Sequence, residues 1–362
     1  MLAESGVHFL LHTFCVDVLL EDRRVRGVVV ANKAGIELVR GQVIVDSTGD
    51  GDIAARAGAG FVLGRANDSI MQPVTRIFRV AGVDLEEMFA YLRHHPEEMN
   101  LPERWDGADY TVQDLTGSSV VMDAFPTLVA EARALGELTV PRDRIGIETG
   151  PLPGVVTINA TRVHGINGTD PDALSQAEIE TQRQMFEVIQ FLRRRVPGYK
   201  RAWLLDSAYQ VGIRETRHIL GEYVLTLDDV LTGKDFQDTV ARGAYPVDLH
   251  DMQVGAEVLG AKVKGRGVTL RKIERAYGIP VRCLVPVEVD AVVLAGRAIS
   301  ASHEAAGSVR GQAVCMTTGH AAGTIAAMSV RENVLPRGLE ITKLQSKLTE
   351  QHAILFYEKA QA

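Results

Sequence analysis

The sequence predicts an α/β protein, and three observations carry that prediction. The apolar run Ala291–Leu294 is typical of a buried parallel strand, and the small-residue stretch Gly311–Met328 after it is typical of a closely packed helix. Near the other end, Gln42–Asp46 has the same strand pattern and leads through a glycine turn into the small-residue segment Ile53–Gly60. The sequence between these ends mixes amphipathic helices with polar loops. We therefore expect strand–turn–helix units at both ends and a different, mixed region between them.

Composition limits the class of protein. With 362 residues the chain exceeds one ordinary core, so two domains are expected. The 46 acidic and 39 basic residues give a net charge of -7, which argues against a nucleic-acid or anionic-lipid surface and favours a small-molecule substrate. The sequence has neither the ~20-residue apolar run of a membrane span nor the basic start of a secretory signal. We expect a cytoplasmic protein.

Cysteine usage points the same way. The chain has three cysteines, Cys15, Cys283 and Cys315, and no Cys-x-x-Cys pair. This count excludes a disulfide framework and an all-cysteine zinc or iron–sulfur site within the chain. The His94–His95 pair lacks a third ligand nearby in sequence, so no metal site is predicted.

The first 46 residues read as short strands separated by turns. The apolar runs Leu10–Leu20, Arg26–Ala31 and Ile36–Val39 are interrupted by Gly, Asn and Asp residues, a pattern typical of a hairpin or a three-stranded meander. The meander leads into the buried strand Gln42–Asp46.

The middle and the end of the chain read differently. A helix is predicted over Leu174–Val196, opening with a capping box of Ser175 and Glu178 and ending before Pro197. The stretch Leu335–Ala362 has weak periodicity and charged faces, which indicates one peripheral helix.

The segment Gly49–Ala54 fits the G-x-G-x-x-A form of the dinucleotide fingerprint. A pyrophosphate beside Asp50 and Asp52 would be repelled by about 3 kcal/mol per like-charge contact, so a phosphate loop is disfavoured. A calcium loop beginning at Asp46 also fails, because its twelfth position is Ala57 instead of a glutamate. Two interpretations remain: a carboxylate turn that binds sugar hydroxyls, and a plain strand-to-helix turn with Asp52 as the helix cap.

Two segments, Val45–Asp52 and Ala295–Arg310, together resemble the FAD-dependent oxidoreductase family, including the heterodisulfide-reductase-A-like and fumarate-reductase-like flavoproteins. The resemblance extends over nearly all of the chain. It implies FAD as cofactor and a discontinuous Rossmann-like FAD-binding domain built from residues 1–65 and 285–334. It also implies an inserted mixed α/β cap or substrate domain over residues 66–284 and a peripheral helix over residues 335–362.

Members of that family usually begin with a strand, a Gly-x-Gly-x-x-Gly turn and a helix that binds the pyrophosphate. The chain begins instead with Met1–Val7, which is similar to a helix that lies further downstream in the family. The comparison predicts an N-terminal truncation on the order of a hundred residues. Such a loss removes the pyrophosphate anchor and leaves exposed sheet edges.

The resemblance also implies which residues contact the cofactor. Asp50 would accept hydrogen bonds from ribityl or ribose hydroxyls, and the helix N-terminus at Gly307–Gln312 would face the pyrimidine edge of the flavin and favour its anionic reduced form. Arg297 and His303 read equally well as cofactor contacts and as residues that fix the loop. The predicted cofactor-binding residues are Val16, Thr48, Gly49, Asp50, Gly51, Gly296, Arg297, His303, Gly307, Ser308, Arg310 and Gln312.

The segment Gly212–Tyr223 resembles the Arg-Glu-Ser/Thr-Arg block of the family. Arg214 and Arg217 share one face if the segment is helical, where they would bind a substrate carboxylate; ion pairs with Glu215 or Glu222 are the alternative. The predicted catalytic residues are Arg214, Arg217, Tyr245, His250 and Arg282, with Tyr277 as a further residue lining the flavin.

The expected reaction is hydride transfer between a small organic substrate and flavin, with His250, Arg214 or Arg217 handling the proton. The alternative is a non-catalytic flavoprotein half that binds a separate chain carrying the phosphate-binding βαβ unit. An electron-transfer partner, including one with iron–sulfur clusters, and a homo-oligomer both stay open. Each version requires the turns at Gly49 and Gly296 to lie side by side.

Overall fold

The computed structural model describes residues 2–100, 120–250, 257–258, 261–262 and 269–356. It divides into two compact units: the first comprises Met1–Ile70, Glu215–Leu249 and Thr269–Ala362, and the second comprises Met71–Arg214 and His250–Val268. The second unit is therefore shorter than the insert expected over residues 66–284, because residues 215–249 and 269–284 cluster with the first unit.

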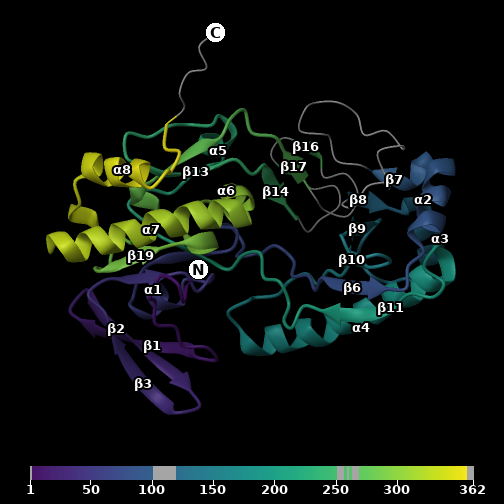
Figure 1. Ribbon diagram of the computed structural model, residues 1–362, viewed down its shortest axis with the longest axis horizontal. Coiled ribbons are helices and arrows are strands. Elements are labelled where there is room, and N and C mark those ends of the chain that lie inside the picture. Colours follow the sequence, from purple (N-terminus) through teal and green to yellow (C-terminus); the bar gives the residue numbers. More distant parts are fainter. Residues whose placement is uncertain (1, 101–119, 251–256, 259–260, 263–268, 357–362) are drawn as a thin grey trace, which may run out of the picture. The chain divides into compact units, whose positions relative to one another are not determined.

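The first unit begins with the expected meander. Strands β1 (Phe14–Glu21), β2 (Arg24–Asn32) and β3 (Gly35–Arg40) form an antiparallel sheet, drawn in purple in Figure 1. A register shift between Cys15 and Asp17 marks an irregularity in β1 at Val16. All of β3 is exposed, so this sheet buries little of its outer strand.

A parallel pair lies at the centre of the first unit. Strand β4 (Ile44–Asp46) pairs with β19 (Val292–Leu294), which joins segments that are nearly 250 positions apart in the sequence. The side chains of β19 are buried, as expected for a parallel strand with both faces covered. Helix α7 (Gln312–Glu332) packs against both strands and is the long helix beside β19 in Figure 1.

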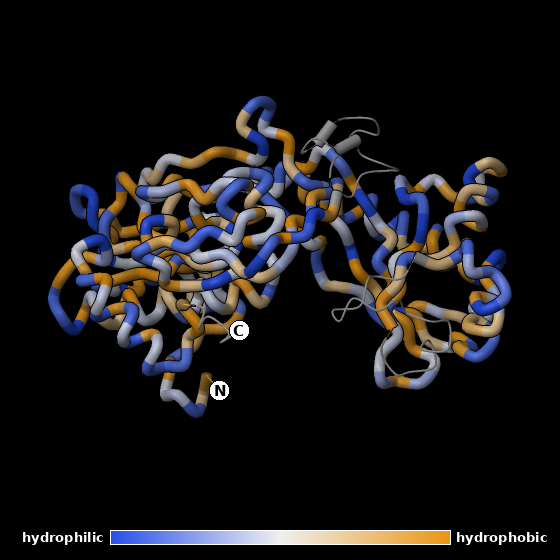
Figure 2. The backbone as a smooth tube through the Cα atoms, turned by 90° about the horizontal axis from the view of Figure 1, so that it is seen from above, coloured by the Kyte–Doolittle hydropathy of each residue, from blue (hydrophilic) through white to orange (hydrophobic). Residues whose placement is uncertain are grey.

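Shorter elements complete the first unit, and its polar loops, blue in Figure 2, alternate with apolar stretches of the tube. The remaining strands form antiparallel pairs. The pairs are β5 (Phe61–Leu63) with β12 (Arg217–Ile219), β13 (Thr239–Gly243) with β18 (Tyr277–Pro280), and β14 (Val247–Leu249) with β17 (Thr269–Arg271). The remaining α-helices are α1 (Asp52–Arg56), α5 (Leu227–Leu231), α6 (His303–Val309) and α8 (Ile341–Glu350).

The second unit is built around one antiparallel sheet in the order β11-β6-β10-β9-β8-β7. Its strands are β6 (Phe78–Ala81), β7 (Met99–Asn100), β8 (Val121–Ala124), β9 (Ile145–Thr149), β10 (Val156–Asn159) and β11 (Trp203–Ser207). Its helices are α2 (Leu85–His94), α3 (Pro126–Ala134) and α4 (Pro171–Arg195). The short strands β15 (Glu257–Val258) and β16 (Ala261–Lys262) also belong to it. An apolar core joins the sheet to these helices through residues such as Phe78, Met88 and Leu192.

Helix α4 begins three residues earlier than predicted. Its cap is Asp170, whose carboxylate accepts from the amides of Asp172 and Ala173, and Pro171 occupies the first helical position. The predicted cap Ser175 instead donates to the Pro171 carbonyl inside the helix. The Asp-Pro signal therefore outweighs the capping-box spacing.

Two further helix predictions differ from the structure. The segment Ala295–Arg310, which precedes the predicted helix Gly311–Met328, contains the separate helix α6, and α7 starts at Gln312. The predicted C-terminal helix over residues 335–362 is reduced to α8 within the described residues. In the part of the chain that the structure describes, no helix is long and apolar enough to cross a membrane, and no group of three or more His, Cys, Asp or Glu residues is arranged to hold a metal ion.

Candidate functional site

The turns after β4 and β19 lie side by side in the first unit. Leu294 pairs with Asp46, and the amide of Ala295 donates to the Asp46 carbonyl at 2.9 Å. Because the two strands are parallel, the segments that follow them leave the sheet at the same edge. This is the convergence that the sequence predicted for Gly49 and Gly296.

Asp46 organises the first turn from inside the protein. Its side chain is buried, one oxygen accepts from the amide and hydroxyl of Thr48, and the other accepts from the amide of Ala54. The Thr48 hydroxyl in turn accepts from the amide of Asp52. The amides of Asp52 and Ala54 at the start of α1 are thus occupied by the turn's own side chains, which leaves fewer free donors for a phosphate at the fingerprint Gly49–Ala54.

Asp50 joins the two turns. Its carboxylate accepts from Arg297 at 2.8 Å and from the Thr216 hydroxyl at 2.6 Å. Gly49 has a left-handed φ of 85°, and a Cβ there would lie 2.7 Å from the Arg297 guanidinium. Glycine at this position therefore lets Arg297 approach the turn.

Asp52 is paired as well. Arg217 donates to its carboxylate at 2.8 Å and to the Asp50 carbonyl at 3.0 Å. The alternative in which Asp52 caps α1 is wrong: the N-cap is Gly51, with no side-chain bond. The repulsion argued above from two unpaired carboxylates does not apply, because Arg297 and Arg217 compensate both charges.

The predicted helix N-terminus at Gly307–Gln312 is divided between two helices. Gly307 and Ser308 are buried within α6, and the Ser308 hydroxyl bonds Tyr277 and the Tyr245 carbonyl. Only Gln312 opens α7, which has no side-chain cap. The amide end of α7 therefore matches the prediction, whereas Gly307 and Ser308 lie in the core.

Arg310 lies at the junction of α6 and α7. Its guanidinium donates to the carbonyl and to the carboxylate of Asp248, each at 2.8 Å. The positive charge of Arg310, a predicted cofactor-binding residue, is thus paired with the carboxylate of Asp248.

His303 belongs to a buried network with Glu215. One oxygen of Glu215 accepts from His303 Nδ1 and from His218 Nε2, each at 2.7 Å. Burial alone would raise the pKa of Glu215, but the hydrogen bonds and charge of the two histidines lower it to about 2. Glu215 is therefore ionised at neutral pH and orients both rings. Sequence reasoning missed this network because His303 is 88 positions from Glu215.

Arg214 and Arg217 do not act together. The segment is extended, not helical: Arg217 opens β12 in the first unit, while Arg214 belongs to the second unit. Arg214 donates to the Pro73 carbonyl at 2.5 Å and to the Thr75 hydroxyl at 2.8 Å. Glu215 bonds two histidines and Glu222 pairs with Arg337, and the alternative of ion pairs between the two arginines and these glutamates stays a prediction.

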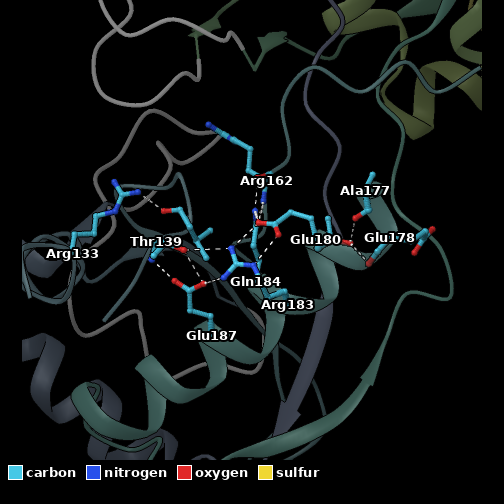
Figure 3. Close-up of polar contacts among 11 residues, drawn as sticks. Arg133, Thr139, Arg162, Ala177, Glu178, Glu180, Arg183, Gln184 and Glu187 are labelled. Carbon is cyan, nitrogen blue, oxygen red and sulfur yellow. Dashed lines mark hydrogen bonds and ion pairs between the residues drawn. The ribbon is translucent and has the colours of Figure 1, made fainter. Parts of the chain in front are cut away.

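In the second unit, His250 is buried and its Nδ1 lies 3.0 Å from the Arg162 guanidinium. Arg162 is also fully buried, and Gln184 of α4 bonds its backbone amide and carbonyl. In Figure 3 the Arg162 side chain extends away from Gln184 while α4 holds its main chain. Because a guanidinium can only donate, His250 Nδ1 is unprotonated here and Nε2 carries the ring proton. Sequence reasoning placed Arg162 in a structured loop and missed its contact with His250, which is 88 positions away.

The remaining predicted catalytic residues have structural partners. Arg282 is bidentate to Asp238, at 2.8 and 3.0 Å. Tyr277 is buried and bonds Ser308, and burial raises its pKa. Tyr245 is half-exposed, and its hydroxyl lies 3.4 Å from the Asp248 carboxylate.

A model of the FAD dependent oxidoreductase family matches residues 1–348. The chain belongs to the FAD-dependent oxidoreductase family. Its cofactor is therefore FAD, and its mixed α/β architecture is that of a Rossmann-like flavoprotein. No curated protein sequence matches the chain.

Solved flavoproteins are similar in fold only at a low level. A p-nitrophenol 4-monooxygenase from Pseudomonas putida DLL-E4 is 11% identical, with a TM-score of 0.38 over 93% of this chain and 51% of that one. A geranylgeranyl bacteriochlorophyll reductase-like protein from Thermoplasma acidophilum is 11% identical, with a TM-score of 0.39 over 97% and 56%. The chain spans about half the length of these structures.

The residues at the paired turns fit a flavin oxidoreductase. Gly296 has a φ of 81°, and a Cβ added to it would meet no atom within 4 Å, so its backbone borders open space. Among the described residues, the buried Nε atoms of Arg297 and Arg310 have no hydrogen-bond partner. Polar groups left in this state are costly unless a ligand completes them. For the phosphate half of FAD this turn offers fewer donors, because the amides of Asp52 and Ala54 already bond side chains of the turn.

Proposed function

We propose that this FAD-dependent oxidoreductase holds the isoalloxazine and ribityl part of FAD at the turns after β4 and β19, and transfers a hydride between it and a small organic substrate. The observation that carries the proposal is the Asp50–Arg297 pair, which joins two glycine turns at the same edge of a parallel sheet. Ligands of open α/β sheets bind at the carboxyl ends of such strands.

Three features would act on the flavin. Arg297 and Arg310 each offer a buried guanidinium Nε, and the uncapped amide end of α7 offers a partial positive charge. When bound, the flavin supplies hydride chemistry. The protein groups would stabilise negative charge on its reduced ring and fix its orientation.

His250 lies in the second unit, and its predicted role in proton handling stays a prediction. Arg162 holds its Nδ1 unprotonated, so that Nε2–H is the donor and the ring accepts a proton only after giving one. Arg214 and Arg217 lose this role in the proposal, because their guanidinium groups already donate hydrogen bonds to other residues. Arg214 donates to Pro73 and Thr75, and Arg217 donates to Asp50 and Asp52.

Titration with riboflavin tests the flavin site directly, because riboflavin contains the isoalloxazine and ribityl groups but no pyrophosphate. We expect riboflavin to bind the purified protein, measured by the quenching of its fluorescence. Arg297→Leu should lower the affinity at least roughly tenfold, which corresponds to about 1.4 kcal/mol of binding free energy. The matched control is Arg337→Leu, which removes another arginine of the first unit that pairs with Glu222 and Asp290. Equal affinities in both variants would refute the assignment.

A second function remains a proposal: a flavoprotein half that is completed by a separate chain with a βαβ phosphate-binding unit. The observation in its favour is a series of exposed apolar side chains before and at the start of β1. They are Leu2, Val7, Phe9, Leu10, Leu11 and Phe14. Under this proposal FAD binds no tighter than riboflavin until the βαβ segment is added, and Phe14→Ser weakens that addition. Tighter binding of FAD than of riboflavin by the chain alone would contradict it.

A further inference from the structure

A pocket of about 310 Å³ lies in the first unit, between the segment after β5 and the start of α6. This volume is at the lower end of small-molecule sites. Its lining is mainly apolar, with side chains such as Val62, Ile219, Leu220 and Val224. The turns at Gly49 and Gly296 do not border it.

His218 borders this pocket and carries a buried ring nitrogen. The residue is 3% exposed, and its Nε2 lies 2.7 Å from the ionised Glu215. Because a carboxylate can only accept, Nε2 carries a proton. Within the described residues Nδ1 is buried and has no hydrogen-bond partner. A buried ring nitrogen without a partner is costly, so Nδ1 is a polar atom that a ligand could complete.

Ser300 borders the same pocket with a second unsatisfied group. The residue is 1% exposed, and its Oγ has no partner among the described residues. Its backbone is fixed on both sides, since its amide donates to the Cys283 carbonyl and its carbonyl accepts from the Leu225 amide. The pocket is therefore bordered by two residues that each carry a polar atom without a partner among the described residues, His218 Nδ1 and Ser300 Oγ.

The charges around the pocket do not favour an ionised ligand. Arg65 is bound in bidentate fashion by Asp68, at 3.0 and 2.6 Å, and Glu304 adds a negative charge at the rim. His303 is directed to Glu215 through Nδ1. A carboxylate or phosphate would meet more negative than positive charge here.

We propose that this pocket binds a small, uncharged, mainly apolar molecule with one hydroxyl group, such as a phenol or a cyclic alcohol. The ligand's O–H donates to His218 Nδ1, and its oxygen accepts from the Ser300 hydroxyl. The apolar body of the ligand lies against Val62, Ile219 and Leu220. The site is separate from the flavin turns and does not depend on the proposed redox reaction.

Calorimetric titration of the purified protein with phenol tests the proposal, with toluene as a probe of similar size that lacks the hydroxyl. We expect phenol to bind roughly tenfold more tightly than toluene, the effect of one to two net hydrogen bonds. Ser300→Ala removes a hydroxyl that has no protein partner, so the variant should fold, and its phenol affinity should approach that for toluene. Ser329→Ala is the matched control, because Ser329 is equally buried, has an unpartnered Oγ and does not border the pocket.

Two further measurements identify the site. Val224→Trp fills the pocket from its exposed rim and should abolish phenol binding, and the imidazole nitrogen resonances of His218 should move with phenol but not with toluene. Equal affinity for the two probes, or no effect of Ser300→Ala, would overturn the proposal. Competition between FAD and phenol would also overturn it, by assigning the pocket to the cofactor.

Discussion

Replacing Glu215 with Gln will destabilise the protein by about 3 kcal/mol at neutral pH. The carboxylate is fully buried and accepts two hydrogen bonds of 2.7 Å from His218 and His303, which lower its pKa from 4.5 to about 2. A lowering of this size corresponds to about 3 kcal/mol in favour of the ionised form in the folded protein. Glutamine keeps the shape, and its amide oxygen can still accept from both rings, but the negative charge that attracts the two histidines is lost.

The effect depends on pH in a defined direction. Because the pKa of Glu215 is lower in the folded than in the unfolded chain, its contribution is complete above about pH 4.5 and disappears as the pH falls towards 2. The difference in unfolding free energy between the wild type and Glu215→Gln should therefore shrink over this range.

Urea unfolding followed by circular dichroism at pH 7, 4 and 3 measures both predictions. Glu222→Gln is the matched control, because Glu222 is partly exposed and its pair with Arg337 at 3.1 Å is expected to contribute under about 1 kcal/mol. A loss below about 1 kcal/mol in Glu215→Gln at pH 7, or a difference that stays constant down to pH 3, would refute the account of the network.

Two further predictions, each with a control substitution, concern the turn at Gly49 and the N-cap of α4. Gly49→Ala and Gly58→Ala both place a Cβ at positive φ and should each cost about 1–2 kcal/mol, but only the former displaces Arg297 and should lower riboflavin affinity; equal affinities would count against the turn. Asp170→Ala should lower the unfolding free energy by about 1 kcal/mol through loss of the α4 cap, whereas Ser175→Ala should change it by less than about 0.5 kcal/mol. A larger effect of Ser175→Ala would favour the capping box of Ser175 and Glu178 as the start of the helix.

Local sequence signals predicted the parts of the fold that local physics determines. The meander followed from alternating apolar residues and turn residues, and the pairing of β4 with β19 followed from two apolar runs that each lead into a glycine turn. The start of α4 was missed by three residues, although Asp170-Pro171 is a strong start signal, because the Ser175–Glu178 spacing was weighted instead.

The partners of the charged residues could not be predicted. Arg214 and Arg217 are three positions apart, yet the backbone between them is extended and they belong to different units. The partners of Glu215 and Asp50 include His303 and Arg297, which are 88 and 247 positions away. Such pairs are set by tertiary packing, which a single sequence does not specify.

Hydrogen–deuterium exchange with and without FAD tests the central claim most directly, because it reports on backbone amides at both turns at once. The account predicts slower exchange in residues 47–52 and 295–298 when FAD is added, with the effect lost in Arg297→Leu. Unchanged exchange in both segments, with protection confined to other parts of the chain, would contradict it.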